Sequence, residues 1–350
     1  GYNALFNARH RQIAPALASV GVQGGALLGL LLLKHAGAAE ESAAWLNLPG
    51  RGLLSVAGPD RLRFLNAMVT ADLRKLDVGH GRYTFLLDAR GRVIADAIVH
   101  AVEGVYLLDT EAGNHAVLIA HLDRYLIADE VELEDESLRY SCIGVEGPCA
   151  ETVLQDLTIP RPSRAFGASP WDGGWVTRTS LTGACGFRSF ISPGKRAALI
   201  TQLEMAGVVP ATDDDARIVR LEHGKPRWGE EITSRYLGPE IGLTGAISKS
   251  IGCYLGQEVV ERIRSRRLLG RILVPVRVAT TAVVKSGEKI FAGQHRVGEV
   301  VSAAFSPRFG QVVGLAYVQT GFPDDQHELV CEPSHAVVNI QAEYTSEGVG

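Results

Sequence analysis

Cys253 and Tyr254 stand between two glycines in the run Gly252-Cys253-Tyr254-Leu255-Gly256-Gln257-Glu258. Glycine permits positive φ and close backbone approach, so the run predicts a tight, exposed loop. A helix is expected to begin near Gln257, and a helix N-terminus favours the thiolate form of a nearby cysteine. Cys253 is therefore a candidate catalytic nucleophile or redox-active thiol. Free cysteines are more often inert packing residues, and spacing alone identifies no Cys–His pair, so both interpretations stay open.

The chain that positions this loop has 350 residues, of which 46% are apolar and 21% are charged. Single hydrophobic cores rarely grow beyond about 250–300 residues, so two or three packed domains are expected. The composition is typical of a soluble globular protein and indicates neither a disordered chain nor a membrane bundle. A net charge of -4 argues against bulk binding to nucleic acid or to an acidic membrane.

The cysteines are odd in number and include no C-x-x-C pair: Cys142, Cys149, Cys185, Cys253 and Cys331. No histidine lies near them at the spacing of metal ligands, so no protein-bound zinc or cluster site is expected. Sparse, unpaired thiols suit a reducing compartment better than a disulfide framework does. A cytoplasmic protein is the resulting expectation.

The N-terminal region contains an apolar run at residues 24–33, preceded by Arg9 and Arg11 and followed by small residues. This pattern resembles a secretory signal. The run is too short to span a bilayer, which takes about 20 apolar residues, and Lys34 ends it abruptly. A buried N-terminal helix or strand is the alternative.

From Gly52 onward, short β-like runs alternate with helical stretches, which predicts a mixed α+β domain. A Pro/Gly/Ser-rich stretch at residues 158–174 separates it from a second βα unit. From Arg271 to Tyr344, short strands separated by Gly-containing turns predict a small antiparallel barrel. The expected division is a first α+β domain over residues 1–140, a second over 141–268 and the barrel over 269–350.

The loop around Cys253 resembles the signature K-G-C-Y-x-G-Q-E of the YgfZ-type folate-binding family. Only the lysine departs, because Ile251 stands at its position and the nearest lysine is Lys249. The segments at residues 58–72, 297–302 and 314–318 are also similar to this family. It belongs to the same superfamily as the glycine-cleavage aminomethyltransferase. The resemblance extends from near Gly52 to near Tyr344.

The resemblance implies a fold with two mixed domains that enclose a folate site, followed by a C-terminal antiparallel β-barrel. In the superfamily segment G-G-x-x-D-D-x-I-V an aspartate contacts the reacting end of the folate. Here Asp96 falls on the second aspartate and Ala95 replaces the first. A carboxylate that faces an apolar slot has a raised pKa and exchanges protons with an amine nitrogen, so Asp96 is a candidate catalytic and folate-binding residue. An ordinary aspartate at a strand end is the alternative.

Further cofactor-binding residues are implied by the resemblance. Tyr83 and Tyr106 occupy positions that contact folate in the aminomethyltransferase, and an aromatic ring stacks on a pterin or aminobenzoate face. Arg217 resembles the first arginine of the A-R-x-x-x-R-L-E-x-G helix, which reaches the cofactor there. Core packing explains either tyrosine nearly as well, and a plain surface arginine is the alternative for Arg217.

Two departures distinguish the chain from the aminomethyltransferase. Ala184 stands where the enzyme has a glutamate that holds the pterin ring, and the enzyme does not carry Cys253. Both departures favour the YgfZ-type interpretation. The arginines from Arg262 to Arg271 are expected to form a solvated helix face; the alternative is attraction of the folate polyglutamate tail or of an acidic partner.

The function implied by the resemblance is binding of tetrahydrofolate or a derivative, with assistance to the assembly or repair of iron–sulfur clusters in target enzymes. Partners would be iron–sulfur client proteins or assembly factors, with neither nucleic acid nor membrane, and a monomer is expected. One alternative is a tetrahydrofolate-dependent aminomethyltransferase or demethylase. Another is a folate-independent adaptor with a vestigial cavity. Whether a reaction is catalysed stays open.

Overall fold

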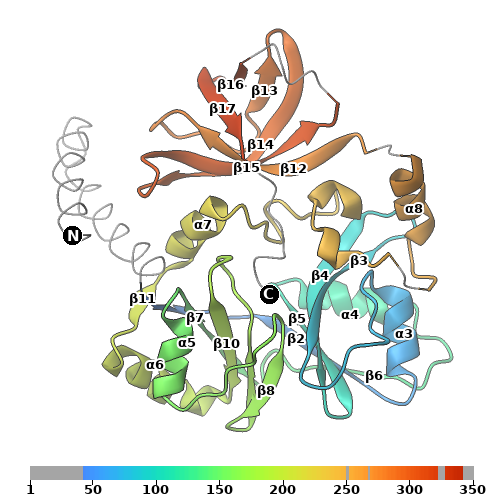
Figure 1. The fold of residues 1–350 in the computed structure, drawn as a ribbon. Helices are drawn as coiled ribbons and strands as arrows, with labels where there is room; N and C mark the ends of the chain where they lie inside the picture. Colours follow the sequence, from blue (N-terminus) through green and yellow to red (C-terminus); the bar gives the residue numbers. More distant parts are fainter. Residues whose placement is uncertain (1–41, 250–251, 267–268, 322–327, 342–350) are drawn as a thin grey trace.

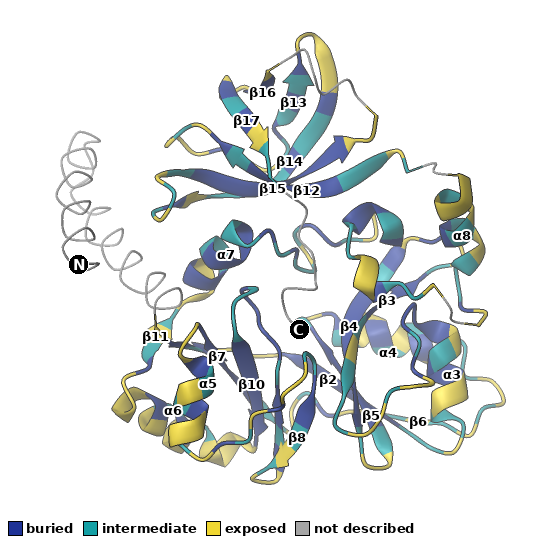
Figure 2. Ribbon diagram, viewed as in Figure 1, coloured by how far each residue is buried: buried dark blue, intermediate teal, exposed yellow. Residues whose placement is uncertain are grey.

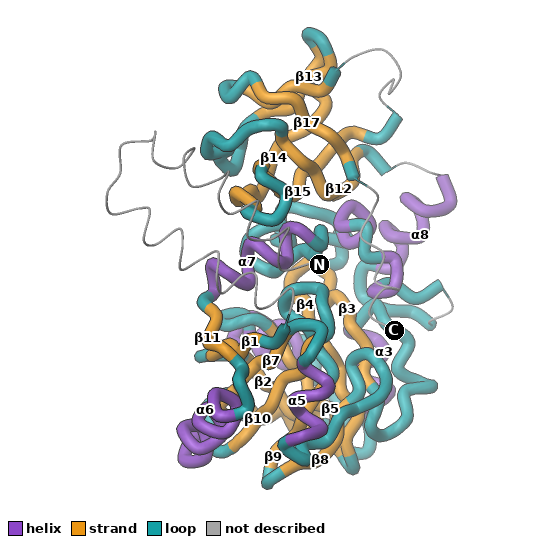
Figure 3. The backbone as a smooth tube through the Cα atoms, turned by 60° about the vertical axis from the view of Figure 1, so that its left-hand side comes forward, coloured by secondary structure: helices purple, strands orange, loops and turns teal. Residues whose placement is uncertain are grey.

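The computed structural model describes residues 42–249, 252–266, 269–321 and 328–341. The apolar run at residues 24–33 and Ile251 lie outside the described residues. Two β-sheets lie side by side at one end of the molecule, and a β-barrel lies at the other (Figure 1). The turned view of Figure 3 shows the same separation, with the link from the sheets to the barrel between them.

The first sheet has the strand order β3-β4-β5-β2-β6, and all of its pairs are antiparallel. Two helices, α3 and α4, pack on one face and complete a hydrophobic core that includes Leu54, Leu65 and Leu118. The turn Asp88–Gly91 connects β3 and β4, with Gly91 at φ 75°. The bounds are β2 Gly52–Ala57, α3 Arg61–Met68, β3 Gly81–Leu87, β4 Val93–Val102, β5 Val105–Thr110, α4 His115–Asp123 and β6 Glu132–Asp135.

The second sheet has the order β11-β1-β7-β10-β9-β8. Strand β1 precedes the first sheet in the sequence but pairs with β7 and β11 of the second sheet. Residues 44–47 therefore belong to the second sheet, although they fall within the range expected for the first domain. The bounds are β1 Ala44–Asn47, β7 Ser141–Glu146, α5 Ala150–Asp156, β8 Ala168–Trp171, β9 Gly174–Thr177, β10 Gly186–Ile191, η1 Pro193–Lys195, α6 Arg196–Met205, β11 Val209–Ala211 and α7 Asp213–Glu222.

Helix α7 begins where the sequence places three consecutive aspartates. Thr212 caps it, since its hydroxyl accepts from the backbone N–H of Asp215 while the Asp215 carboxylate accepts from the backbone N–H of Thr212. Negative charge in the first turn also complements the helix dipole. The acidic cluster is thus the start of a helix.

The C-terminal strands form a closed antiparallel barrel in the order β12-β15-β14-β13-β16-β17, which confirms the predicted barrel. Its core consists largely of valines, as expected for strands packed on a pleated surface. The bounds are β12 Arg271–Val278, β13 Lys289–Ala292, β14 His295–Ser306, β15 Gln311–Gln319, β16 Leu329–Glu332 and β17 Ala336–Ile340.

The segment between α7 and the barrel carries η2 Gly238–Ile241, η3 Thr244–Ala246 and α8 Gln257–Arg266. It shares a core with the barrel, in which Tyr236 stacks on Tyr317 with ring centroids 3.7 Å apart. Both sheets are largely buried, whereas α6 and α8 present mainly exposed residues (Figure 2). The arginines of α8 that the structure describes are exposed, as expected for a solvated helix face. Within the described residues, no helix combines the length and apolarity needed to cross a membrane.

Candidate active site

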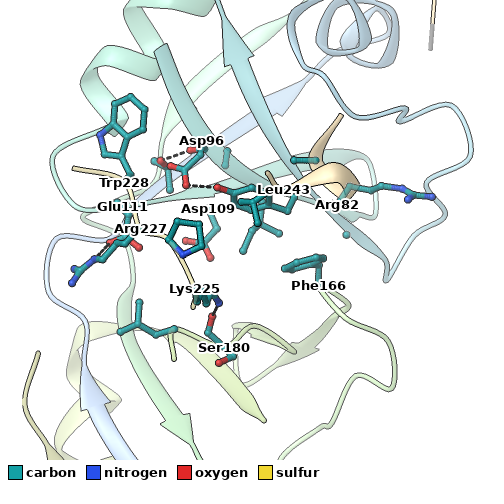
Figure 4. Close-up of a pocket in the computed structure, with 18 of the residues that line it drawn as sticks. Arg82, Asp96, Asp109, Glu111, Phe166, Ser180, Lys225, Arg227, Trp228 and Leu243 are labelled. Carbon is teal, nitrogen blue, oxygen red and sulfur yellow. Dashed lines mark hydrogen bonds and ion pairs between the residues drawn. The ribbon is translucent and has the colours of Figure 1, made fainter. Parts of the chain in front are cut away.

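A cavity of about 340 Å³ lies where the two sheets meet the segment between α7 and the barrel (Figure 4). The first sheet contributes β3, β4 and β5, and the second contributes β10 and the loop before it. Aromatic and apolar side chains form much of the wall, among them Phe166, Trp228 and Leu243. Several ionisable side chains lie in this largely apolar wall, which is the usual composition of a small-molecule site.

Asp96 is a buried acidic group of the first sheet that lines the cavity. Asp96 is only 7% exposed, and its Oδ2 accepts a hydrogen bond from the Tyr83 hydroxyl at 2.7 Å. Its Oδ1 has no hydrogen-bond partner among the residues that the structure describes. Burial raises the pKa of Asp96 to about 6, against the opposing effect of the Tyr83 hydrogen bond. Asp96 therefore exchanges a proton near neutral pH and keeps one oxygen available to a ligand.

Strand alternation explains why Asp96 faces the cavity. Successive side chains of β4 point to opposite faces, so Ala95 and Val99 join the core under α3 and α4 whereas Asp96 and Ile98 line the cavity. The backbone carbonyl of Asp96 accepts a hydrogen bond from the Thr110 hydroxyl at 2.7 Å. The neighbouring strand thus fixes the position of the carboxylate.

A buried cluster of ion pairs forms another part of the wall. The Asp109 carboxylate accepts from Arg51 Nε at 2.5 Å and from an Arg188 nitrogen at 2.5 Å. Glu111 pairs with Arg51 at 2.7 Å and with Arg227 at 3.2 Å. Although burial opposes it, the arginines hold the pKa of Asp109 below its usual range and lower that of Glu111 to about 2. Both carboxylates therefore stay ionised and already have partners, which leaves Asp96 as the proton-exchanging acid.

The second-domain side of the cavity carries Lys225, just after α7. Its Nζ donates to the backbone carbonyl of Ser180, in a loop fixed by the fully buried Glu146. Glu146 accepts from the Ser180 hydroxyl at 2.8 Å and from the backbone N–H of Leu181 at 2.6 Å. Burial lowers the pKa of Lys225 to about 8, although the charge of Glu146 opposes this.

The structure brings Tyr83 and Asp96 together in the cavity but does not bring Tyr106 to them. Tyr106 and Leu108 lie on the face of β5 that packs in the core with α3, whereas Asp109 lies on the cavity face. The Tyr106 side chain lies in the core and within 6.0 Å of the Arg61 guanidinium. Because of this alternation Tyr106 does not line the cavity, and its contact with a ligand stays a prediction.

Arg217 is also placed elsewhere. Its Nε pairs with Glu230 at 2.8 Å, and another of its nitrogens donates to the backbone carbonyl of Ala303 in β14 at 3.1 Å. It does not line the cavity. These donors connect α7 to the segment after it and to the barrel, and the ligand contact of Arg217 stays a prediction.

Cys253 is exposed, as the glycine-flanked run predicts, and it is not among the residues that line the cavity. Gly256 has φ 84°, and a Cβ there would meet the Asp88 carbonyl oxygen at 2.5 Å, so this position requires glycine. The loop is therefore held against the β3–β4 turn. Ala184 is not a lining residue either, although Ser180 and Leu181 of the same loop are.

Several lining residues carry no expectation from the sequence: Arg51, Asp109, Glu111, Arg188, Lys225, Arg227 and Trp228. Only Asp109, at the end of a β-like run, gave any local signal. No group of three or more His, Cys, Asp or Glu side chains suited to a metal ion occurs within the described part of the chain.

Together the fold and the cavity define a three-lobed α+β protein with a small-molecule site between its two sheets. Residues 34–250 match the GCVT N-terminal domain, and residues 271–345 match the glycine cleavage T-protein C-terminal barrel domain. The chain therefore belongs to the glycine cleavage T-protein family.

Individual relatives agree with this assignment. The chain is 31% identical over 306 residues to a protein of Thermus thermophilus named aminomethyltransferase, covering 83% of this chain and 86% of that protein. A protein of the same name from Rubrobacter xylanophilus is 29% identical over 289 residues, or 80% of this chain and 77% of that one. The crystal structure of glycine cleavage system aminomethyltransferase T from Bartonella henselae superimposes with a TM-score of 0.82 at 24% identity, covering 89% of each chain. The predicted fold is thereby confirmed.

Proposed function

We propose that this protein binds tetrahydrofolate or a derivative in the cavity and transfers a one-carbon unit there, with Asp96 as the proton-exchanging residue. The observation that carries the proposal is the state of Asp96, which is buried, lines the cavity, has a pKa of about 6 and has one carboxylate oxygen without a partner among the described residues. The relatives named aminomethyltransferase support the same class of reaction.

The residues present suit a reduced folate. Phe166, Trp228 and Tyr83 offer aromatic faces to a planar ring, and the free oxygen of Asp96 offers an acceptor or a proton to a ring nitrogen. When bound, the folate supplies the nitrogen atoms that carry the one-carbon unit. The chain contributes orientation through the cavity wall, burial of Asp96 away from bulk water, and proton exchange at the Asp96 carboxylate. Tyr83 holds that carboxylate by its hydroxyl.

The proposal is tested by titration and turnover. Tetrahydrofolate is expected to bind saturably, and the purified protein is expected to consume an aminomethyl donor when tetrahydrofolate is present. Asp96→Asn keeps the shape of the side chain but removes its proton exchange, so turnover is expected to fall about 10²–10⁴-fold while folate binding persists. Leu138→Asn, at a 94% exposed position, is the control variant.

Two results would count against this proposal. Lack of saturable binding at millimolar tetrahydrofolate favours a folate-independent adaptor with a vestigial cavity. Unchanged turnover in Asp96→Asn removes the carboxylate from the reaction.

A second candidate function, assistance to the assembly or repair of iron–sulfur clusters, is favoured by the exposed Cys253 in a loop that resembles the YgfZ-type signature. The partners would be client enzymes or assembly factors in the cytoplasm. For this function Cys253→Ala is expected to fold normally but to lower the activity of cluster-dependent enzymes in cells. Full complementation of a deletion strain by this variant rules the thiol out.

A further inference from the structure

The cavity has a basic wall on the second-domain side, across from the first-sheet residues Asp96 and Tyr83. Arg188 extends from β10 and Lys225 follows α7, so both come from the second-domain side (Figure 4 shows Lys225 beside Ser180). Neither residue takes part in the proton exchange proposed above. Their donors therefore need a separate account.

Arg188 has a donor left over after its ion pair. The residue is 3% exposed, and one terminal nitrogen is paired with Asp109 Oδ2 at 2.5 Å. Its Nε has no hydrogen-bond partner within the described residues. The other Asp109 oxygen is occupied by Arg51, and a buried N–H without an acceptor is unfavourable. Arg188 thus presents an unused donor in the wall of a cavity.

Lys225 also has donor capacity to spare. An ammonium group has three N–H donors, and the hydrogen bond of Lys225 in the structure goes to the Ser180 carbonyl. Its backbone is fixed at both ends: the N–H donates to the Arg220 carbonyl at 2.8 Å, and the carbonyl accepts from Arg220 at 3.0 Å. Arg220 is itself buried in an ion pair with Glu231 at 3.1 Å. The fold therefore holds Lys225 at the cavity rather than leaving it to solvent.

We propose that Lys225 and Arg188 form a subsite that binds a carboxylate of the ligand. Two charged donors from one side of an enclosed site form short, charge-assisted hydrogen bonds with the two oxygens of one carboxylate. Asp109 accepts from Arg51 and from a terminal nitrogen of Arg188, and Glu111 accepts from Arg51 and Arg227. Within the described residues neither carboxylate takes the Nε donor of Arg188 or a donor of Lys225. The subsite rests on the proposed function for its ligand and specifies the substrate class as a carboxylate-bearing molecule.

This carboxylate has two possible sources, which share the same chemistry. It belongs either to the glutamate tail of the folate or to a separate small reactant that shares the cavity. Three probes distinguish them: tetrahydrofolate, tetrahydrobiopterin, which has the reduced ring without a carboxylate, and p-aminobenzoyl-glutamate, which has the carboxylates without the ring. Glycine and acetate, added to protein already loaded with tetrahydrofolate, probe a separate reactant.

The experiment is calorimetric titration of each probe into the parent protein and into Lys225→Met. Lys225→Arg keeps the charge, and Lys75→Met removes an exposed lysine as the matched control. Circular dichroism and thermal unfolding verify that each variant is folded. If Lys225→Met does not fold, Lys225→Arg and Lys225→Gln are compared in its place.

If the folate tail is the source, Lys225→Met weakens binding of tetrahydrofolate and p-aminobenzoyl-glutamate at least tenfold and changes tetrahydrobiopterin less than twofold. If a separate reactant is the source, Lys225→Met abolishes glycine or acetate binding and leaves the folate probes unchanged. Lys225→Arg and Lys75→Met retain binding in both cases. The subsite is overturned if Lys225→Met binds every carboxylate probe as the parent protein does, if tetrahydrobiopterin weakens equally, or if the parent protein binds no carboxylate probe.

Failure of the proposed function has a different signature. In that case the parent protein binds neither tetrahydrofolate nor tetrahydrobiopterin. The carboxylate probes still report on Lys225 by themselves, because saturable binding of p-aminobenzoyl-glutamate that is lost in Lys225→Met supports the subsite without any folate.

Discussion

The cavity and the loop Gly252–Gly256 each carry a candidate site residue, Asp96 and Cys253, but the surroundings of these two residues differ. In the cavity, Asp96 is 7% exposed and its proton affinity is set by burial and by Tyr83. In the loop, Cys253 is exposed, and the backbone of Gly256 packs closely against the β3–β4 turn. Any chemistry at Asp96 would thus depend on desolvation and fixed partners, whereas any chemistry at Cys253 would depend on solvent access. Four variants test this contrast, in order of decreasing effect.

The largest expected effect is on the buried ion pairs. Asp109→Asn removes the charge that neutralises Arg51 and Arg188, and breaking a buried pair in this way costs about 3–5 kcal/mol. Urea unfolding is expected to show that loss in the free energy of unfolding. Arg63→Ala, at a side chain 68% exposed, is the control and is expected to change it by less than about 1 kcal/mol. A loss for Asp109→Asn as small as that of the control would mean that the cavity is solvated like the surface.

The second effect concerns the pH dependence of Asp96. The pKa of its carboxyl is raised to about 6, so the folded protein holds this proton more tightly than the unfolded chain does. That stabilisation is complete below about pH 4 and is lost as the pH rises through 6. Each tenfold difference in proton affinity corresponds to about 1.4 kcal/mol, so ionising Asp96 costs the folded state about 3 kcal/mol at pH 8.

Asp96→Asn cannot ionise and is therefore expected to be more stable than the parent protein at pH 8, with the difference disappearing toward pH 4. Thermal and urea unfolding across this range measure it. Asp72→Asn is a control of opposite sign, because the pair with Arg74 lowers the pKa of Asp72 to about 2 and stabilises the protein above its usual pKa. If Asp96→Asn is no more stable at pH 8 than at pH 4, relative to the parent, Asp96 is not desolvated.

These pH effects come from a residue that the sequence identifies only through a motif. The alternation of β4 puts Asp96 on the face opposite the core, and the resemblance of its segment to a superfamily motif marks it as a candidate site residue. Both its position and its candidate role thus follow from local sequence. The same alternation explains the placement of Tyr106. Its position resembles a folate contact of the aminomethyltransferase, but strand β5 turns the side chain into the core with α3. Fold class, barrel and most strands are likewise local patterns repeated along the chain, and they were predictable.

The ion-pair cluster was not predictable for a physical reason. Arg51 is separated from Asp109 by 58 residues and Arg188 from Asp109 by 79, and no periodicity links residues so far apart. The strand β1, which crosses to the second sheet, is another long-range choice that the local sequence does not specify. Lys225 follows the end of a helix, where its side chain direction depends on contacts with Arg220 and Ser180. Such sites emerge only from tertiary packing.

A smaller effect is expected in the loop, where two glycines form a matched pair. Gly256→Ala forces an alanine to φ 84° and brings its Cβ to 2.5 Å from the Asp88 carbonyl oxygen, whereas a Cβ at Gly252 has nothing within 4 Å. Gly256→Ala is expected to lower the free energy of unfolding by about 2 kcal/mol, and Gly252→Ala by less than about 1 kcal/mol. Equal losses for the two variants would show that the loop is not held against the β3–β4 turn.

The smallest effect on stability is expected at Cys253, and there access decides the outcome. Cys253→Ala removes an exposed side chain and is expected to change the free energy of unfolding by less than about 0.5 kcal/mol.

Cys149 is also exposed, whereas Cys142 and Cys331 are buried, and burial raises the pKa of these two thiols to about 12 and about 11. Iodoacetamide at pH 8 is therefore expected to label Cys253 and Cys149 and to spare the buried pair, as mass spectrometry of the peptides would show. Cys149→Ala is the matched control, because a special role for the loop requires that only Cys253→Ala lower the activity of cluster-dependent enzymes in cells. Equal labelling of the buried thiols would erase the distinction, since reactivity would then not follow solvent access.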